Sequence, residues 1–215
     1  MRLRKKPWIE KAMTELIGDY VLMHDLEQYK GKWQELFPGK KLCLEIGCGK
    51  GRFTIGMAEL FPEKAFIGIE TQHDIAYYPG KAAKDKEMDN VKIICANAEA
   101  LNEWFEPGEI KELYLNFSDP WPKARHAKRR LTHRGFLAKY AQLLGPGGHM
   151  RFKTDNRGLF DFSVEEFKEC NWKLDKLTYD LHNSEYMENN VMTEYERRFS
   201  GLGFSINRVE AKKPE

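Results

Sequence analysis

The chain alternates between short β-like runs and segments of helical length, and this alternation restricts the fold more than any other feature. The β-like runs are Leu42–Ile46, Ala65–Glu70, Val91–Ala96, Leu113–Phe117 and Met150–Lys153. The helical segments between them include Phe53–Leu60, Ala98–Phe105 and Phe136–Leu144. Strands that alternate with helices predict βαβ units, and therefore an α/β fold with a mostly parallel sheet and helices on both faces.

The two ends of the chain depart from this alternation. Two later extended runs, Trp172–Tyr179 and Ser205–Val209, have no long helix between them, so we expect an antiparallel pair at the edge of the sheet. The first 40 residues are amphipathic and charged, and we interpret residues 1–40 as an arm or helix that precedes the core. Residues 41–215 are long enough to bury a sizeable core as one domain.

The first β-like run ends in a glycine-rich segment that suits a ligand site. Glycines at 47, 49 and 51 allow a tight strand-to-helix turn and let a ligand approach the backbone closely. Glu70 ends the second run roughly 20 residues later, the interval at which nucleotide folds place an acid against ribose hydroxyls. The spacing is GxGxG, and Glu45 would repel a pyrophosphate but attract the ammonium of an amino-acid moiety. The pattern therefore favours S-adenosylmethionine over NAD.

Two of these polar residues also have a simpler structural interpretation. Glu45 could be a strand-end carboxylate that pairs with Lys41 or Arg52, although we favour cofactor binding. Asn97 follows the third β-like run, where its side chain could cap the next helix or hydrogen-bond adenine. Both roles of Asn97 can coexist.

The segment Asn116–Lys123 presents a carboxylate and an indole in a loop stiffened by two prolines. Each proline fixes its own φ near −65° and biases the residue before it, Asp119 or Trp121, toward an extended conformation. Residues 123–134 then supply six cations and no acid, a cluster suited to a phosphate backbone. Trp121 could stack on a base or pack beneath the loop, and some cations could pair with nearby acids instead. Together the loop and the cluster suggest chemistry on RNA.

Composition and charge restrict the class of protein, its location and its ligands. The net charge is only +2, so affinity for nucleic acid must come from local clustering. No apolar run approaches the roughly 18 to 20 residues needed to cross a bilayer, and the amino terminus lacks the apolar centre of a secretion signal, so we expect a soluble, cytoplasmic protein. The cysteines are not spaced like a zinc site, and we expect free thiols and no metal; they are Cys43, Cys48, Cys95 and Cys170.

These motifs carry a resemblance to a known family. Residues 44–51 resemble motif I of the Rossmann-like S-adenosylmethionine-dependent methyltransferases. Segments 114–123, 125–132, 152–156 and 193–196 together resemble the bacterial tRNA (guanine-N7)-methyltransferases. The Ser-Asp-Pro-Trp-Pro-Lys sequence at 118–123 is highly specific, and the match runs from Pro7-Trp8 almost to the end of the chain.

The resemblance implies a seven-stranded sheet with an antiparallel final strand, and methylation of N7 of a variable-loop guanine in tRNA by a monomer or homodimer. Asp119 would be the catalytic residue. The implied cofactor-binding residues are Glu45, Gly47, Gly49, Gly51, Glu70, Asn97 and Asp119. The implied substrate contacts are Lys123, Asp155, Thr193, Glu194, Tyr195 and Glu196. The implied RNA contacts are Arg125, His126, Ala127, Lys128, Arg129 and Arg130.

Three positions leave alternatives open. Pro79-Gly80 departs from the family pattern and should break or kink the helix after Glu70. The segment Thr193–Glu196 also fits a capping box at the start of a helix. Asp155 could merely cap the turn into Asn156, although the carboxyl end of a parallel strand is where such sheets place ligands.

Two other functions compete with the leading hypothesis. A methyltransferase of the same fold could act on a small molecule, but the basic residues 123–134 disfavour this interpretation. The chain could also be a noncatalytic RNA-binding module, against which the intact Glu45, Glu70 and Asp119 argue.

Overall fold

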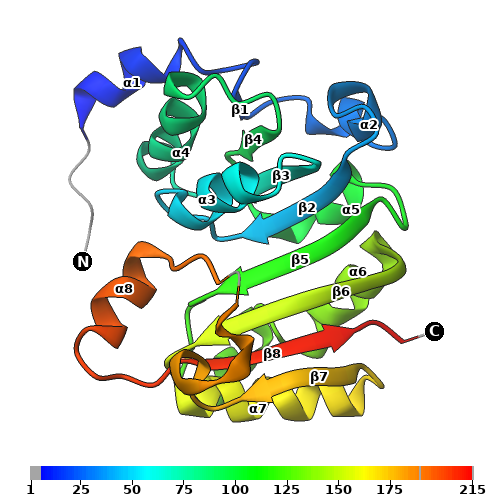
Figure 1. The fold of residues 1–215 in the computed structure, drawn as a ribbon. Coiled ribbons are helices and arrows are strands. Elements are labelled where there is room, and N and C mark those ends of the chain that lie inside the picture. The colour runs from blue at the N-terminus through cyan, green and yellow to red at the C-terminus, as the bar shows by residue number, and fades with distance from the viewer. Residues whose placement is uncertain (1–5, 189, 215) are drawn as a thin grey trace. The chain divides into compact units, whose positions relative to one another are not determined.

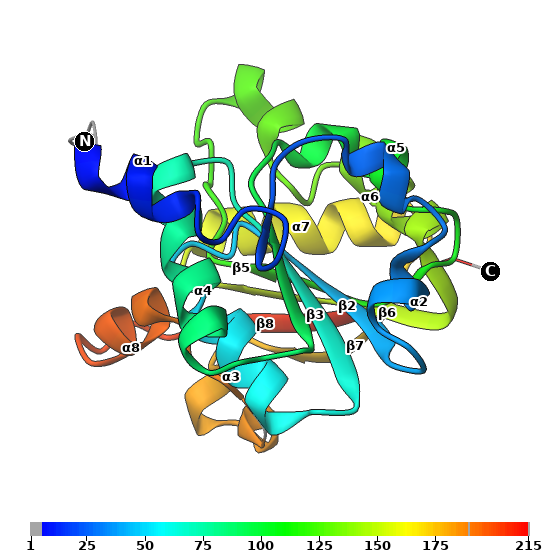
Figure 2. The same cartoon turned by 90° about the horizontal axis from the view of Figure 1, so that it is seen from above.

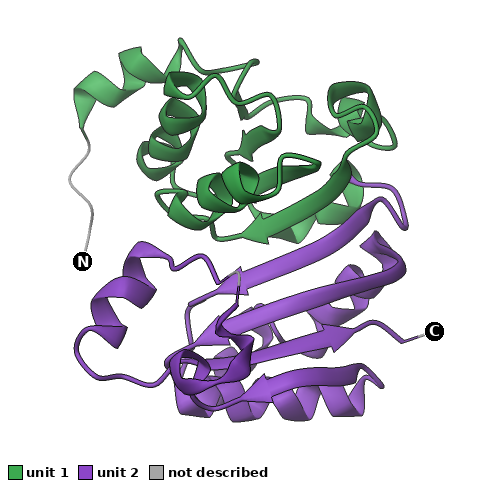
Figure 3. Ribbon diagram, in the orientation of Figure 1, with its two compact units in different colours: residues 1–104 green, residues 105–215 purple. Residues whose placement is uncertain are grey.

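The structure, a computed structural model, describes residues 6–188 and 190–214. The chain folds into two compact units, residues 1–104 and 105–215 (Figure 3). This boundary differs from the one expected at residue 40, and the described residues before position 40 belong to the first unit. Residues 1–5 of the expected arm lie outside the described residues, and an arm that acts separately stays a prediction. No helix in the described ranges is long and apolar enough to cross a membrane.

Unit 1 contains four parallel strands (Figure 1). Their order is β1 (Val21–Leu22), β4 (Val91–Ile94), β3 (Lys64–Ile69) and β2 (Lys41–Ile46). After their first residues, β2 and β3 are buried throughout, which is typical of parallel strands covered on both faces. The predicted β-like runs at β2, β3 and β4 are confirmed, with bounds that differ by two residues at most. The edge strand β1 lies in the stretch that we interpreted as an arm.

Short helices connect the strands of unit 1. They are α1 (Pro7–Met13), α2 (Trp33–Leu36), α3 (Arg52–Leu60), α4 (His73–Asp85) and α5 (Leu101–Trp104), with 3₁₀ turns at Leu26–Tyr29 and Ala98–Ala100. Trp33 is fully buried, and its indole N–H donates to the Trp104 carbonyl at 2.9 Å. This bond ties the amino-terminal stretch to the end of the unit.

The helix α4 runs through Pro79, so the expected break is wrong. A proline in a helix interior removes one backbone hydrogen bond and costs about 3 kcal/mol or more, which packing has to offset. A Cβ on Gly51 would lie 2.3 Å from Cβ of Pro79, and a Cβ on Gly80 would lie 2.4 Å from Cγ2 of Val21. At Pro79 and Gly80 the helix α4 therefore packs closely against Gly51 and Val21. This tertiary packing keeps the helix intact.

Unit 2 contains the other four strands. Their order is β5 (Ile110–Asn116), β6 (Leu144–Thr154), β8 (Asn207–Lys212) and β7 (Lys173–Thr178). β5 and β6 are parallel, whereas β8 is antiparallel to both β6 and β7. The predicted antiparallel pair of late strands and the antiparallel final strand are therefore confirmed. The described residues form eight strands in all, one more than expected, and the short β1 accounts for the difference.

Helices α6 and α7 lie on one face of the strands of unit 2 (Figures 1 and 2). The helical elements of this unit are α6 (Arg134–Leu143), α7 (Arg157–Glu169) and α8 (Glu194–Ser200), with 3₁₀ turns at Ala124–Arg129, Leu181–Asn183 and Glu185–Met187. Phe152 of β6 faces α7, because its ring stacks on Phe160 at 6.1 Å. Side chains alternate along a strand, so Arg151 and Lys153 point to the opposite face.

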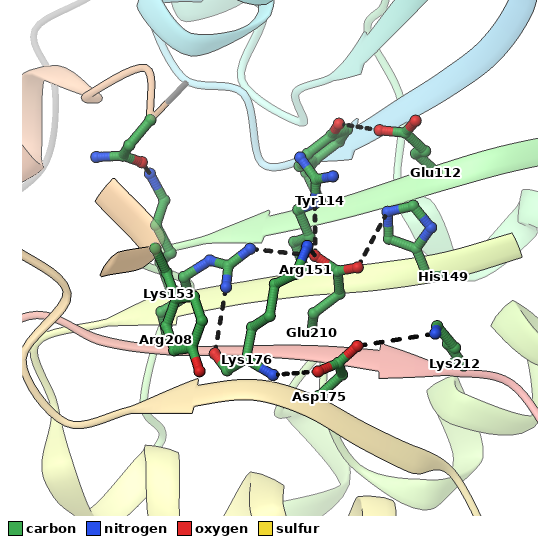
Figure 4. A network of polar contacts seen from close by, with 12 residues as sticks. Glu112, Tyr114, His149, Arg151, Lys153, Asp175, Lys176, Arg208, Glu210 and Lys212 are labelled. Carbon is green, nitrogen blue, oxygen red and sulfur yellow. Dashed lines mark hydrogen bonds and ion pairs between the residues drawn. The ribbon is translucent and has the colours of Figure 1, made fainter. Parts of the chain in front are cut away.

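That opposite face carries a charged network (Figure 4). Glu210 of β8 is 5% exposed and accepts hydrogen bonds from Arg151 and Arg208, both at 3.1 Å. Burial alone would raise the pKa of Glu210, but Arg151 and the neighbouring cations outweigh it and hold this pKa below its usual value. The network satisfies buried charges on a sheet face that no helix of unit 2 covers.

Candidate active site

The glycine-rich turn of unit 1 leaves open space along its backbone. Gly47, Gly49 and Gly51 have φ of 80°, 56° and 82°, values in the left-handed region that favours glycine. The N–H of Gly47 and of Cys48 donate to the carbonyl of Ile69, at 2.8 and 2.9 Å, which fixes the turn at the end of β3. A Cβ at position 47 or 49 would meet no atom within 4 Å. This space along the backbone fits the close approach of a ligand.

Glu70 holds this turn from the end of β3. Its carboxylate accepts hydrogen bonds from the backbone N–H of Gly49 at 3.1 Å and of Gln72 at 2.9 Å. The hydroxyl of Thr71 also donates to this carboxylate, at 3.4 Å. A carboxylate offers about four acceptor positions, so capacity remains for a ribose hydroxyl. Glu70 thus positions the turn and can also bind a ribose.

Glu45 lies in the β2 strand just before the turn and is 2% exposed. The hydroxyl of Thr54 on α3 donates to its carboxylate, a partner that sequence reasoning missed. Burial, and then the charges of Glu45 and Glu70, raise the pKa of the Cys48 thiol well above its ordinary value. A buried carboxylate beside an open glycine turn suits the ammonium of an amino-acid moiety.

Asn97 takes the capping role that the sequence predicted. Its side-chain oxygen accepts a hydrogen bond from the N–H of Glu99 at 3.0 Å. Among the described residues its amide NH₂ has no partner, and the residue is exposed. The cap therefore leaves a donor for adenine. The turn and these three polar residues fit S-adenosylmethionine.

In unit 2, the loop after β5 presents Asp119 as an exposed carboxylate. Phe117 and Trp121 have φ of 55° and 41°, so Trp121 is not extended as its following proline predicts. Arg130 fixes this conformation, because its guanidinium donates to the carbonyls of Pro120 and Trp121, each at 3.1 Å. Asp119 itself has no hydrogen-bond or ion-pair partner among residues 6–188 and 190–214.

The residue before Asp119 carries a further sign of a ligand. The Oγ of Ser118 is buried, and within the described part of the chain it has no hydrogen-bond partner. Buried polar atoms are normally hydrogen-bonded, so such an atom beside a free carboxylate fits a site that a polar ligand completes.

The basic segment forms the 3₁₀ turn Ala124–Arg129, and its cations differ in their surroundings. Arg125, Lys128 and Arg129 are exposed and form no ion pair with any described residue. Arg129 lies 4.9 Å from the centre of the Trp121 ring, so Trp121 packs beneath the segment. Arg134 instead pairs with Glu166 of α7 at 2.5 Å. The segment therefore contributes three unpaired charges at the surface.

Asp155 follows β6 and accepts a hydrogen bond from the Tyr195 hydroxyl at 3.1 Å. Burial, and then Asp155, raise the pKa of Tyr195, so the phenol stays a donor. The helix cap after β6 is Asn156, whose side chain accepts from the N–H of Leu159 at 2.8 Å. The structure thus brings together two predicted substrate contacts that lie 40 residues apart.

Thr193 caps α8 as the capping box predicts, because its hydroxyl accepts from the N–H of Glu196 at 2.9 Å. The Glu196 side chain turns into the protein, where Lys153 donates at 2.7 Å and His182 and Asn190 also bind it. Burial would raise the pKa of Glu196, but the Lys153 ammonium and these donors hold it below its usual value. The carboxylate of Glu196 therefore fixes the start of α8.

Sequence reasoning missed several residues that support the site. Thr54 donates to Glu45, a contact that no local pattern encodes. Arg130 was predicted as an RNA contact, but its hold on the carbonyls of the Asp119 loop was not. Lys153 offered one signal, since a lysine within an apolar strand is rarely buried unless it is paired. Its partner, Glu196, lies 43 residues away and could not be read from the strand. The described residues contain no cluster of side chains that could hold a metal ion, and the cysteines are free.

The chain is similar to known methyltransferases in sequence. Residues 39–209 match the family described as "Putative methyltransferase". The tRNA (guanine-N(7)-)-methyltransferase of Bacillus subtilis (strain 168) is 46% identical over 213 residues, which cover 99% of each chain. The enzyme of that name from Lachnoclostridium phytofermentans is 46% identical over 212 residues, which cover 98% of each chain.

Solved structures show the same fold. The 16S rRNA methyltransferase KamB aligns with a TM-score of 0.65 at 16% identity, over 86% of this chain and 94% of that chain. An antibiotic-related methyltransferase aligns with a TM-score of 0.63 at 18% identity, over 84% and 92%. The fold is therefore the Rossmann-like methyltransferase fold that the family resemblance implied, and it contains the mostly parallel sheet that the strand pattern predicted. With the close relatives above, these findings show that the chain belongs to the tRNA (guanine-N7)-methyltransferase family of S-adenosylmethionine-dependent enzymes.

Proposed function

We propose that this protein transfers the methyl group of S-adenosylmethionine to N7 of a variable-loop guanine in tRNA, forming 7-methylguanosine. The observation that carries the proposal is the free, exposed carboxylate of Asp119 on a loop held by Arg130. The nearly full-length similarity to tRNA (guanine-N(7)-)-methyltransferases supports the choice of substrate. We expect the enzyme to act in the cytoplasm, where tRNA is found, and to be a monomer or a homodimer.

The cofactor half of the site is the glycine turn with its polar neighbours. Glu45 binds the ammonium of the methionine moiety, Glu70 binds the ribose, and Asn97 binds adenine with its free amide. Gly47 and Gly49 let the cofactor lie against the backbone, whereas Gly51 lets the turn pass close to Pro79. We also assign Asp119 to the cofactor, as the resemblance implies. When bound, S-adenosylmethionine supplies a methyl group activated by its sulfonium charge.

The reaction needs no general base, because guanine N7 carries a lone pair and no proton. What the chain must supply is an in-line orientation of the base and compensation for the positive charge that develops on the purine. The Asp119 carboxylate can accept hydrogen bonds from N1–H and the exocyclic amine of guanine, which orients the ring. Its negative charge also stabilises the cationic product.

The remaining substrate contacts divide into two roles. Lys123, Asp155, Thr193, Glu194 and Tyr195 bind the nucleotide. Glu196 positions the three of them at the start of α8, because its own carboxylate already binds three donors. Along the RNA backbone, Arg125, Lys128 and Arg129 bind phosphates together with the neighbouring His126 and Ala127. Arg130 follows these residues in the sequence, and it donates hydrogen bonds to the carbonyls of the Asp119 loop.

The test is incubation with methyl-labelled S-adenosylmethionine and an unmodified tRNA transcript, followed by reduction and aniline cleavage at 7-methylguanosine. We expect label in the RNA and a single cut in the variable loop. Label only in a small molecule would favour the alternative methyltransferase, and tRNA binding without any label would favour the noncatalytic module. Replacing the variable-loop guanine with adenosine in the same transcript is the matched control, and it should abolish both label and cleavage.

A further inference from the structure

Four aromatic rings form a continuous series that begins beside the Asp119 loop. Phe117 contacts Tyr195 at a centroid distance of 5.0 Å, and Tyr195 stacks on Phe199 at 4.0 Å with an interplanar angle of 18°. Phe199 then contacts Phe204 edge to face at 5.7 Å. We call these four residues the aromatic series. It leads from the loop after β5 along α8 to the turn behind it.

The outer end of the aromatic series is exposed. Tyr195 is 41% exposed and Phe204 is 52% exposed, and the neighbouring Leu202 is 65% exposed. Tyr195 has a ring neighbour on each side in the series, whereas Phe204 has Phe199 alone. Phe204 is therefore the position at which a further flat ring can join the series. Exposed apolar surface of this kind on a helix and its adjoining turn usually marks a binding site.

The aromatic series has the carboxylate of Asp155 at its inner end and two arginines farther along α8. Arg197 and Arg198 lie on α8, and neither forms an ion pair with any residue that the structure describes. The guanidinium of Arg198 lies 5.6 Å from the centre of the Phe199 ring. Aromatic rings interleaved with unpaired arginines are the combination with which proteins bind single-stranded nucleic acid, because every base has a flat face and a phosphate follows it.

The inner end of the aromatic series is continuous with the candidate site. Phe117 precedes Asp119 by two residues, and the Tyr195 hydroxyl donates to Asp155. α8 lies beyond the carboxyl ends of β5 and β6, and no other helix of unit 2 covers it (Figure 1). A guanine bound at Asp119 and Asp155 would therefore have its neighbouring nucleotide within reach of the aromatic series.

We propose that Phe204, as the exposed end of the aromatic series, stacks on an unstacked base adjacent to the methylated guanine, while Arg197 and Arg198 bind its phosphates. This inference rests on the proposed function, because it takes RNA as the ligand. The aromatic series thus extends the substrate site from one nucleotide to at least two. It holds the neighbouring base without reading its sequence, since stacking accepts any base.

The experiment uses unmodified tRNA with 2-aminopurine in place of the base on the 5′ or the 3′ side of the target guanine. Stacking quenches 2-aminopurine, so its emission in the complex reports whether a ring covers it. The variants are Phe204→Leu, which keeps the apolar area but removes the ring, and Phe204→Trp, which keeps a ring. Tyr179→Leu is the matched control, because Tyr179 is 40% exposed, has an arginine 3.9 Å from its ring centre and makes no contact with the aromatic series.

For Phe204→Leu we expect tRNA affinity to fall about fivefold or more, the loss of at least about 1 kcal/mol for one stacked base. Emission from one of the two probes should rise, while the slope of log K against log[salt] stays unchanged. Phe204→Trp should restore both affinity and quenching. Arg198→Gln should instead lower the salt slope by about 0.7, the value for one phosphate contact to a single strand.

The outcomes separate the possible failures. Wild-type protein that leaves N7 of the tRNA guanine unlabelled would refute the proposed function itself. Normal labelling, with affinity and emission in Phe204→Leu equal to wild type, would overturn the aromatic series as an RNA contact. A change confined to the oligomeric state by light scattering, with unchanged tRNA affinity, would assign the surface to a second copy of the chain and would also overturn it.

Discussion

The carboxylates that we assign to the cofactor, in unit 1, and the one that we assign to the substrate, in unit 2, are held in opposite ways. In unit 1, Glu45 and Glu70 are 2% and 8% exposed, and each already accepts a hydrogen bond from the chain. In unit 2, Asp119 is exposed and has no partner among the described residues. The cofactor half is therefore preorganised by the protein, whereas the substrate half leaves its main carboxylate for the incoming base to pair.

The difference follows from the ligands that each half would bind. A small cofactor enters the same turn in every cycle, so fixed hydrogen bonds lower the entropy that binding costs. A guanine in RNA has to leave its stack before it can bind, and its own N–H groups then provide the donors that Asp119 lacks. Behind this free carboxylate, unit 2 keeps a buried scaffold of Lys153 and Glu196.

The largest effect should come from breaking that scaffold. Lys153→Met leaves Glu196 charged and buried without its cation, so we expect a loss of about 3–5 kcal/mol in the free energy of unfolding. Urea unfolding at pH 7 measures it. The double variant Lys153→Met with Glu196→Leu removes both charges and should recover most of the loss. A single variant as stable as wild type would mean that the pair is not part of the scaffold.

The same pair adds a dependence on pH. The pKa of Glu196 is lower in the folded protein, so its contribution is fully present above the unfolded value of about 4.3 and is lost as the pH falls through the folded value. The stability difference between wild type and the double variant should therefore change below about pH 4 and stay constant above about pH 5.

The next effect tests the free carboxylate itself. Asp119→Asn should lower the rate of methyl transfer by about 10²–10³, the size of effect seen when one preorganised electrostatic group is removed. Affinity for tRNA should change little, because phosphate contacts dominate binding. Single-turnover rates at saturating tRNA and cofactor provide the measurement, and Asp89→Asn, at an 86% exposed side chain, is the control. A rate near wild type would remove Asp119 from the catalytic role.

Glu70→Ala tests the preorganised half. We expect cofactor affinity to fall by about 1.5–3 kcal/mol, since the variant loses charge-assisted bonds to the ribose and the anchor of the glycine turn. Calorimetry with S-adenosylmethionine measures the change, and the exposed Glu63→Ala serves as the control. Unchanged cofactor affinity in a folded Glu70→Ala protein would contradict the assignment.

The smallest effects concern the basic segment. Arg125→Ala, Lys128→Ala and Arg129→Ala should each make the plot of log K against log[salt] less steep by about 0.7, with cofactor affinity unchanged. Arg130→Ala should mainly lower the rate of methyl transfer, because Arg130 binds the carbonyls of the Asp119 loop. Lys81→Ala, which removes an exposed pair with Asp85, should leave the slope unchanged. Wild-type salt slopes in all three of the Arg125→Ala, Lys128→Ala and Arg129→Ala variants would refute phosphate binding by this segment.

Local patterns predicted the strands well because their signal is local. β2 and β3 are continuous apolar runs, and their predicted bounds differ from the observed ones by a single residue at one or both ends. The helical segments named from the sequence did not include α7, whose thirteen residues carry six charged ones beside a buried face. The helix α4 continues through Pro79 because it packs closely against Gly51 and Val21. Both lie far from Pro79 in the sequence, so no local pattern predicts this packing.

The residues of the candidate site also divide into those that local motifs predict and those that only the tertiary structure reveals. Motifs pointed to Glu45, Glu70 and Asp119, since Glu45 lies at the end of a strand and the other two follow one. Contacts between distant segments, such as the one between Lys153 and Glu196, depend on the tertiary structure. The sequence indicates this contact only through the presence of a lysine in an apolar strand.

The raised pKa of Cys48 has a consequence for chemical selectivity. The thiolate is the nucleophilic form of cysteine, and it would compete with guanine for an electrophilic methyl group held against the same turn. Burial together with the charges of Glu45 and Glu70 keeps Cys48 protonated. Burial first, and the two carboxylates second, thus make the thiolate that could take up a methyl group still rarer at this position.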